Sequence, residues 1–163
     1  MGNAYTFRMP GGIPGDLSRQ SQATVEDGRF NSSLPFPGYG LPGKLDGSGN
    51  FVPIAGGDTA AAVYGFLVRP YPTQSAQEGI GVATPPTTGI SNVLRRGYMT
   101  VKSNAGTPAK GGAVFVRISA PSGAKVIGGV EAVADGANTI QLTNATFNGA
   151  ADAAGNVEIA YNI

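Results

Sequence analysis

The sequence has no cysteine, no histidine and no tryptophan among its 163 residues. Without cysteine there can be no disulfide, no thiolate metal site and no cysteine nucleophile. Without histidine the chain lacks the commonest general base and the commonest metal ligand. An aromatic content of 8% with no tryptophan also leaves few side chains that could form the flat aromatic platforms on which sugars bind. We therefore predict a protein that is not an enzyme, with no catalytic residues, no cofactor and no metal.

Charge is scarce as well, because Asp, Glu, Lys and Arg make up 13% of the chain, about half the usual share. The net charge of +1 is too small for binding that depends on neutralising phosphates, so we predict no nucleic acid partner. The chain contains no run of 18 apolar residues and no basic segment followed by an apolar one. We therefore expect no membrane partner, no secretory signal and synthesis in a cytoplasm. A weakly charged surface suits a protein that works in an assembly.

Glycine and proline are abundant instead, with 26 and 12 residues that favour turns over long helices. Between the turns, rows of alternating apolar residues occur at 93–102, 113–118 and 157–163. Such rows predict an all-β fold, an antiparallel β-sandwich or barrel with long Pro/Gly loops. We expect an extended N-terminal arm at 1–24 and a single β domain at 25–163. The residues expected to be largely buried are Val114, Phe115, Val116, Ile140, Leu142, Val157, Ile159 and Tyr161.

Three stretches predict local structure more closely. Residues 24–30 read as two short strands around a turn, because Asp27-Gly28 is a turn signal. Residues 60–69 predict either a buried strand or one helical turn that leads into a strand. Residues 90–102 predict the central strand, with a bulge at Gly97.

Letters typical of a dinucleotide-binding motif occur at 38–43, as Gly-Tyr-Gly-Leu-Pro-Gly. That motif needs a strand before it and a helix after it. Here Pro35 and Pro37 precede the glycines and Pro42 interrupts them, so no helix can start there. We interpret this stretch as a structural loop rather than a nucleotide site.

Candidate interaction residues occur first in the predicted arm, where Tyr5, Phe7 and Met9 alternate before Pro10. Either this segment forms an edge strand on the protein's own sheet, or it reaches a neighbouring subunit. An isolated segment cannot offset its ordering entropy, about 1–2 kcal/mol per residue, so it must order against another surface. We predict that this surface belongs to a neighbour.

A second candidate is the basic pair Arg95-Arg96, with Lys102 and Arg117 nearby in the sequence. These side chains either flank a strand as ordinary exposed residues or form a patch that docks on an acidic protein surface. Arginine suits such docking because its guanidinium pairs with carboxylates through two parallel hydrogen bonds. The predicted capsid or oligomer contacts are therefore Tyr5, Phe7, Met9, Arg95 and Arg96.

Four ordered blocks carry a family resemblance, at 65–69, 93–101, 112–117 and 145–162. In their order and spacing they resemble the structural cement, or decoration, proteins of tailed bacteriophages. The resemblance covers residues 60–163 well and the first 60 loosely. It implies a β-sandwich or β-tulip domain, often described as jelly-roll-like, and it supplies no catalytic residues.

This resemblance sets the functional expectations. It implies a virion protein made in the bacterial host, bound to the outside of the capsid and stabilising it by bridging subunits of the major capsid protein. It also implies self-association, as a homodimer or alternatively as a trimer. Two other classes stay open at this point: another virion β-module from a head fibre, tail or baseplate, and a carbohydrate-binding β-sandwich.

Overall fold

The computed structural model describes residues 12–70 and 84–163 of the chain. Over these ranges the regular structure consists of strands and three short 3₁₀ turns, which confirms the predicted all-β class. The strands are β1 (Thr24–Arg29), β2 (Pro42–Leu45), β3 (Phe51–Pro53), β4 (Gly65–Val68), β5 (Ile90–Lys102), β6 (Ala113–Arg117), β7 (Val130–Glu131), β8 (Thr139–Phe147) and β9 (Asn156–Tyr161). The turns are η1 (Gln20–Gln22), η2 (Ala60–Ala62) and η3 (Gly136–Asn138).

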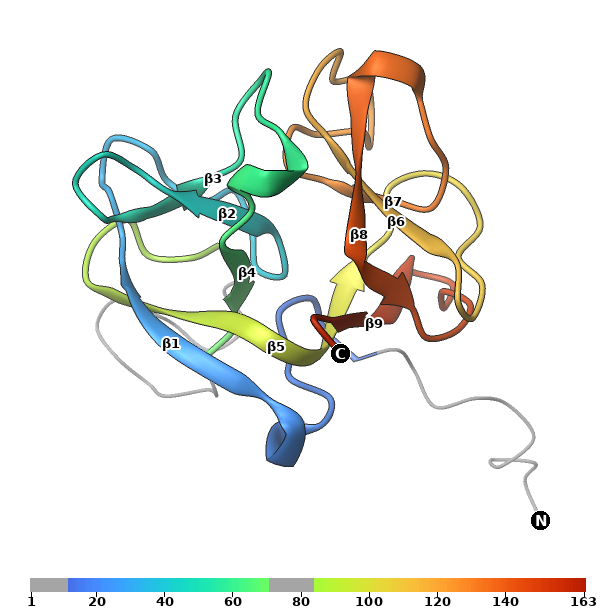
Figure 1. The fold of residues 1–163 in the computed structure, drawn as a ribbon, viewed down its shortest axis with the longest axis horizontal. Helices are drawn as coiled ribbons and strands as arrows, with labels where there is room; N and C mark the ends of the chain where they lie inside the picture. The colour runs from blue at the N-terminus through green and yellow to red at the C-terminus, as the bar shows by residue number, and fades with distance from the viewer. Residues whose placement is uncertain (1–11, 71–83) are drawn as a thin grey trace.

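Strand β5, 13 residues long, belongs to both halves of the molecule (Figure 1). Its first part pairs antiparallel with β1 and with β4, and from Gly97 onward it pairs antiparallel with β9. Thr24 pairs with Arg96 and Val25 with Leu94, so the bulge lies at Arg95, two residues before Gly97, where it was predicted. Gly97 has a φ of 140°, which suits glycine where β5 passes between the halves.

The first half is a curled antiparallel layer in which β3, β2, β4 and β5 follow one another and β1 lies along β5. A parallel bridge between Phe30 and Phe51 joins the end of β1 to β3 and draws the layer together. Its core is aromatic: the ring of Phe36 stacks on that of Phe51 at 5.0 Å and meets Phe30 edge-on at 6.2 Å.

The second half continues the sheet in the order β5, β9, β8, β6 and β7. A parallel bridge between Ser103 and Val130 connects the chain after β5 to β7, so this half curls as well. Its core holds buried Val101, Val114, Val116, Leu142, Val157 and Ile159. Phe66 of β4 meets Tyr161 of β9 edge-on at 5.0 Å, which joins the two halves by direct packing.

Most of the predicted core is buried, but Phe115 and Ile140 are only half-buried. Phe115 lies on the face of β6 opposite Val114 and Val116, as strand alternation requires. Ile140 packs at the margin of the core. The stretch 60–69 combines both features considered for it, since the η2 turn leads into β4.

The predicted turn at Asp27-Gly28 is wrong, because both residues lie inside the continuous strand β1. Pairing with β5 over the whole of β1 outweighs the local turn preference. Gly28 serves close packing instead: a Cβ there would lie 2.7 Å from Ser91 Oγ and 3.0 Å from Phe51 Cβ. The glycine therefore lets β1 approach the core of the first half.

Candidate interaction surface

Arg95 takes part in a small cluster with β1 and the residue before β4. Its guanidinium lies 3.5 Å from the ring centre of Tyr64, and its Nε is 3.3 Å from Glu26 Oε2. The Tyr64 hydroxyl donates to the same Glu26 oxygen at 2.6 Å, and this hydrogen bond raises the pKa of Tyr64. The Arg95 side chain keeps 31% of its surface exposed. It is thus held in place by its own chain while one side remains open.

Arg96, the next residue of β5, is exposed. No ion pair involves Arg96 within residues 12–70 and 84–163. The structure therefore separates the two predicted arginines, one held by a partner and one open to solvent. The other predicted contacts, Tyr5, Phe7 and Met9, lie outside the described residues.

Arg117 does not belong to a basic patch, contrary to the interpretation of it as an exposed neighbour. Its side chain is 1% exposed and its Nε donates to Glu131 Oε1 at 2.5 Å. Its Nη2 bonds both Glu131 Oε2 at 2.9 Å and Asp135 Oδ2 at 2.7 Å. Its Nη1 donates to the carbonyl oxygens of Ser119 and Ala120. All of its polar atoms are therefore engaged inside the second half, and the residue is structural.

Residues 12–23, which fall in the predicted arm, pack against β5 in the structure; we call this segment the strap. Gly15 N–H donates to Thr100 O at 2.8 Å, and Thr100 N–H donates to Asp16 O at 2.9 Å. Leu17 forms a bridge with Met99 and packs against the core. The strap thus covers the backbone of the second part of β5. The domain boundary at 24/25 remains a prediction, and residues 1–11 are the undescribed remainder of the arm.

Side chains also fasten the strap to the second half. Ser18 Oγ donates to Glu158 Oε1 at 2.5 Å, and Arg19 Nη2 donates to Glu158 Oε2 at 3.0 Å. Asn148 Nδ2 donates to the same carboxylate from the loop before β9. Partial burial opposes ionisation of Glu158, but the hydrogen bonds outweigh it and its pKa is lowered. Arg19 also lies 3.9 Å over the ring of Tyr98.

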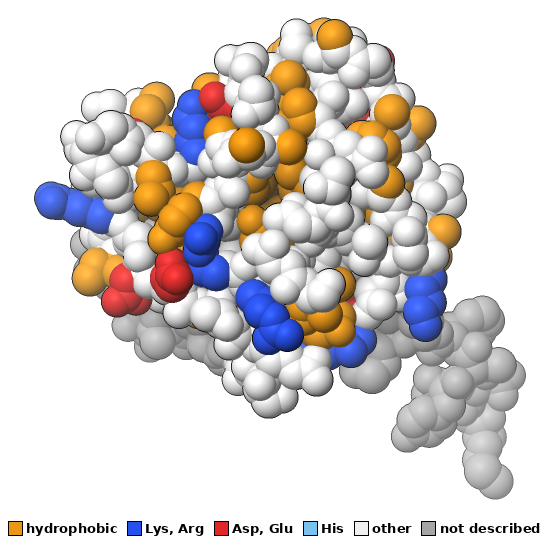
Figure 2. Space-filling view, viewed as in Figure 1, with side chains coloured by type: hydrophobic (Ala, Val, Ile, Leu, Met, Phe, Trp, Pro, Cys, Tyr) orange, Lys and Arg blue, Asp and Glu red, His pale blue; other side chains and the backbone are white. Residues whose placement is uncertain are grey.

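Strand β1 presents an exposed surface that the sequence did not predict. The reason is that a turn was predicted at Asp27-Gly28, in the middle of this strand. Thr24, Val25, Glu26, Asp27 and Arg29 are exposed. Val25 is 39% exposed, and Ile90, which faces Arg29 across the ladder, is 75% exposed. Figure 2 shows charged side chains beside apolar ones along the side where β1 and β5 lie. The combination suits contact with another protein.

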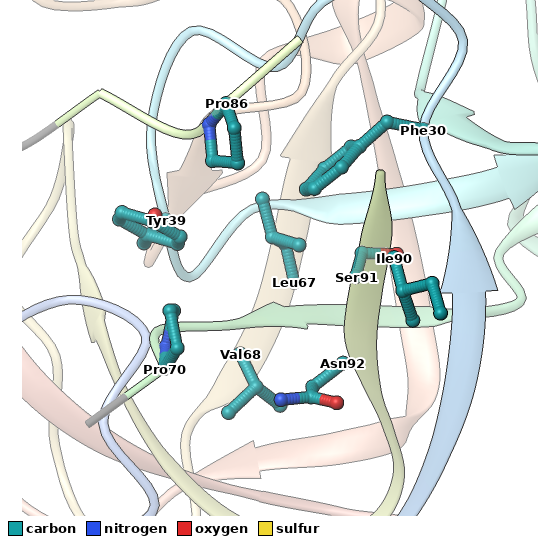
Figure 3. Close-up of a pocket in the computed structure, with 9 residues that line it drawn as sticks. All are labelled: Phe30, Tyr39, Leu67, Val68, Pro70, Pro86, Ile90, Ser91 and Asn92. Atoms are coloured by element: carbon teal, nitrogen blue, oxygen red, sulfur yellow. The ribbon is translucent and has the colours of Figure 1, made fainter. Parts of the chain in front are cut away.

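A small pocket lies beside this surface, with Pro70 and Pro86 on either side of it (Figure 3). It encloses about 40 Å³ and is lined in part by Tyr39, Leu67 and Ser91. Pockets for drug-sized molecules hold roughly 300–1,000 Å³, so this one suits a few waters at most. The buried Ser91 hydroxyl has no hydrogen-bond partner among the described residues, which fits a bound water there.

Within residues 12–70 and 84–163, no group of three or more acidic side chains is arranged to hold a metal ion. In the same part of the chain, no helix has the length and apolar character to cross a membrane.

These features define an all-β protein whose described surface carries the exposed strand β1, the exposed Arg96 and the strap. The family model for the XM1 gp53 minor capsid protein matches residues 2–161. The chain therefore belongs to this family of phage minor capsid proteins, and it is a capsid-associated structural protein of the virion. The resemblance inferred from the sequence, to proteins associated with phage capsids, is confirmed.

A solved structure agrees with this assignment at the level of the fold. A chain of "The capsid of Myoviridae Phage XM1" superposes with a TM-score of 0.68 at 18% identity, over 99% of this chain and 97% of that chain. At that identity the likeness shows the fold alone. A search of curated proteins found no significant match.

Proposed function

We propose that this protein is a cement, or decoration, protein that binds the outside of a bacteriophage capsid and bridges subunits of the major capsid protein. The observation that carries this proposal is the family match over residues 2–161. The structural neighbour comes from the capsid of phage XM1, and this supports a place in a phage capsid for the present chain. A protein that clamps a finished shell needs area and shape complementarity rather than chemistry, and about 1,600 Å² of total buried surface is usual for a stable contact.

Arg96 is the residue best placed to contact an acidic capsid surface. It is exposed on β5, whereas Arg95 is held against Tyr64 and Glu26. In this proposal Arg95 keeps the edge of β5 ordered while Arg96 pairs with a carboxylate of the capsid protein. Low overall charge reduces the cost of removing water from the rest of the contact.

The proposal is tested by adding purified protein to shells that lack it and measuring the bound fraction by co-sedimentation. Arg96→Glu should weaken binding roughly tenfold, about 1.4 kcal/mol, because an attraction becomes a repulsion. Lys110→Glu is the matched control, since Lys110 is exposed between β5 and β6 in the other half. Equal binding by both variants would remove Arg96 from the interface.

Position and self-association need separate measurements. A map of the intact particle should show the chain on the outer surface, in contact with more than one major capsid protein subunit. Density inside the shell, or on the tail, would overturn the proposal. The free protein is expected to sediment as a homodimer at tens of micromolar. A monomer would count against the homodimer, and a trimer would indicate a three-fold position.

A further inference from the structure

Strand β1 is paired along one edge only, within the part of the chain that the structure describes. Its six residues form a ladder with β5, and no named strand of residues 12–70 and 84–163 pairs with its other edge. Figure 1 shows β1 running along the outside of β5. An open edge presents a row of N–H and C=O groups, and it is a ready template for an added strand.

We propose that this edge receives residues 5–9 of a second copy of the chain, which add to β1 as an antiparallel strand. The inference rests on the proposed function in one respect, namely the presence of a second copy. If each arm is received by the other copy, the same contact forms twice around a two-fold axis. The exchange would account for a stable pair of molecules without a large apolar face.

The chemistry of the two segments matches in one register. With Arg8 opposite Glu26, Met9 lies opposite Val25 and Tyr5 opposite Arg29. The apolar row of the arm then lies on the face that carries Val25, and the arginine lies beside a carboxylate. Directly opposed residues of antiparallel strands share a face, so these pairs can touch.

The outward face of β1 continues onto β5 in a way that favours this register. Val25 pairs with Leu94, and Ile90 shares the face of Leu94 by strand alternation. The exposed Ile90 therefore lies on the same face as Val25, across from Arg29, which this register places opposite Tyr5. On the other face the Glu26 side chain is 47% exposed, which leaves room for a second arginine besides Arg95.

The chain geometry favours a second copy over the protein's own arm. Gly12 lies beside Thr100, since a Cβ on Gly12 would be 2.8 Å from Thr100 Oγ1. The nearest end of β1 pairs with Arg96, four residues back along β5, or about 13 Å of strand. From Gly12 to Met9 the chain can span at most about 11 Å. A hinge this short favours exchange between copies over folding back.

The absence of native cysteine allows a clean cross-linking test on the full chain. One variant carries Phe7→Cys and another carries Asp27→Cys, the position opposite residue 7 in this register. Both variants are checked for wild-type circular dichroism, mixed and oxidised. A disulfide-linked heterodimer should form at least about tenfold faster than with Thr143→Cys, an exposed control on β8, because only the register pair meets the Cβ distance required.

The Glu26→Cys variant tests which face of β1 receives the side chain of residue 7. In an antiparallel pair the side chain at position 26 points away from that of residue 7. Cross-linking of Phe7→Cys to this position should stay at the level of the Thr143→Cys control. Equal rates at positions 26 and 27 would refute strand addition, because a paired strand alternates its faces.

Two further outcomes would overturn the inference. If a chain that carries both Phe7→Cys and Asp27→Cys closes a disulfide within itself at high dilution, the arm belongs to its own sheet. If Phe7→Cys cross-links only to the capsid protein on shells, the arm binds the capsid protein and not β1 of a second copy. Binding to shells is measured in parallel: cross-linking without shell binding defeats the proposed function alone, and shell binding without cross-linking defeats this inference alone.

Discussion

The buried ion pair between Arg117 and Glu131 allows a quantitative test of how the second half is held together. The two side chains are 1% and 0% exposed and share two hydrogen bonds, at 2.5 and 2.9 Å. The perturbation is Arg117→Met, which keeps much of the side-chain length and removes the charge. It leaves the Glu131 carboxylate buried without its counter-charge.

The expected cost follows from that burial. Removal of one partner from a buried pair costs about 3–5 kcal/mol, mainly because an uncompensated charge remains in an apolar setting. For a chain of this length, each kcal/mol lowers the melting temperature by roughly 2–4 °C. We therefore expect Arg117→Met to lower the melting temperature by roughly 6–20 °C.

Replacement of both partners, as Arg117→Met with Glu131→Leu, should recover most of this loss, because no charge then stays buried. Calorimetry and urea unfolding on the single and double variants measure the two values, with Lys110→Met as an exposed control expected within about 0.5 kcal/mol of wild type. A single variant that loses less than about 1 kcal/mol, or a double variant as unstable as the single, would refute the reasoning.

Three other regions give further predictions. Gly97→Ala should cost about 1–3 kcal/mol in urea unfolding, because φ is 140° and a Cβ would crowd Ala23, whereas Gly47→Ala in open space should be nearly neutral. Hydrogen bonds from Asn50, above all, hold the pKa of Asp46 far below 3.8. That contribution is complete above about pH 4 and is lost on acidification, so a pH–melting profile of Asp46→Asn should fall less in acid than wild type. Glu158→Gln should speed amide exchange in the strap while leaving β8 protected; unchanged exchange would show that the backbone bonds suffice.

The sequence alone determined the class of fold and much of the core. Rows of alternating apolar residues such as 113–118 and 157–163 can bury one face only as strands, so the all-β prediction followed from local pattern. The lack of cysteine and histidine likewise excluded thiol and imidazole chemistry directly, from residue type alone. These properties are readable because each depends on residue type or on neighbours a few positions away.

Tertiary structure decided what local pattern could not. Arg117 reads as an exposed residue near the end of a strand, yet Glu131 and Asp135 surround it, 14 and 18 positions further along the chain. Asp27-Gly28 reads as a turn, yet β5 pairs with it across more than 60 residues of sequence and keeps the strand straight. In each case a partner far along the chain decides the outcome. Glu131 and Asp135 give the Arg117 guanidinium the counter-charge that it needs once it is buried. Pairing with β5 outweighs a local preference of about 1 kcal/mol in β1.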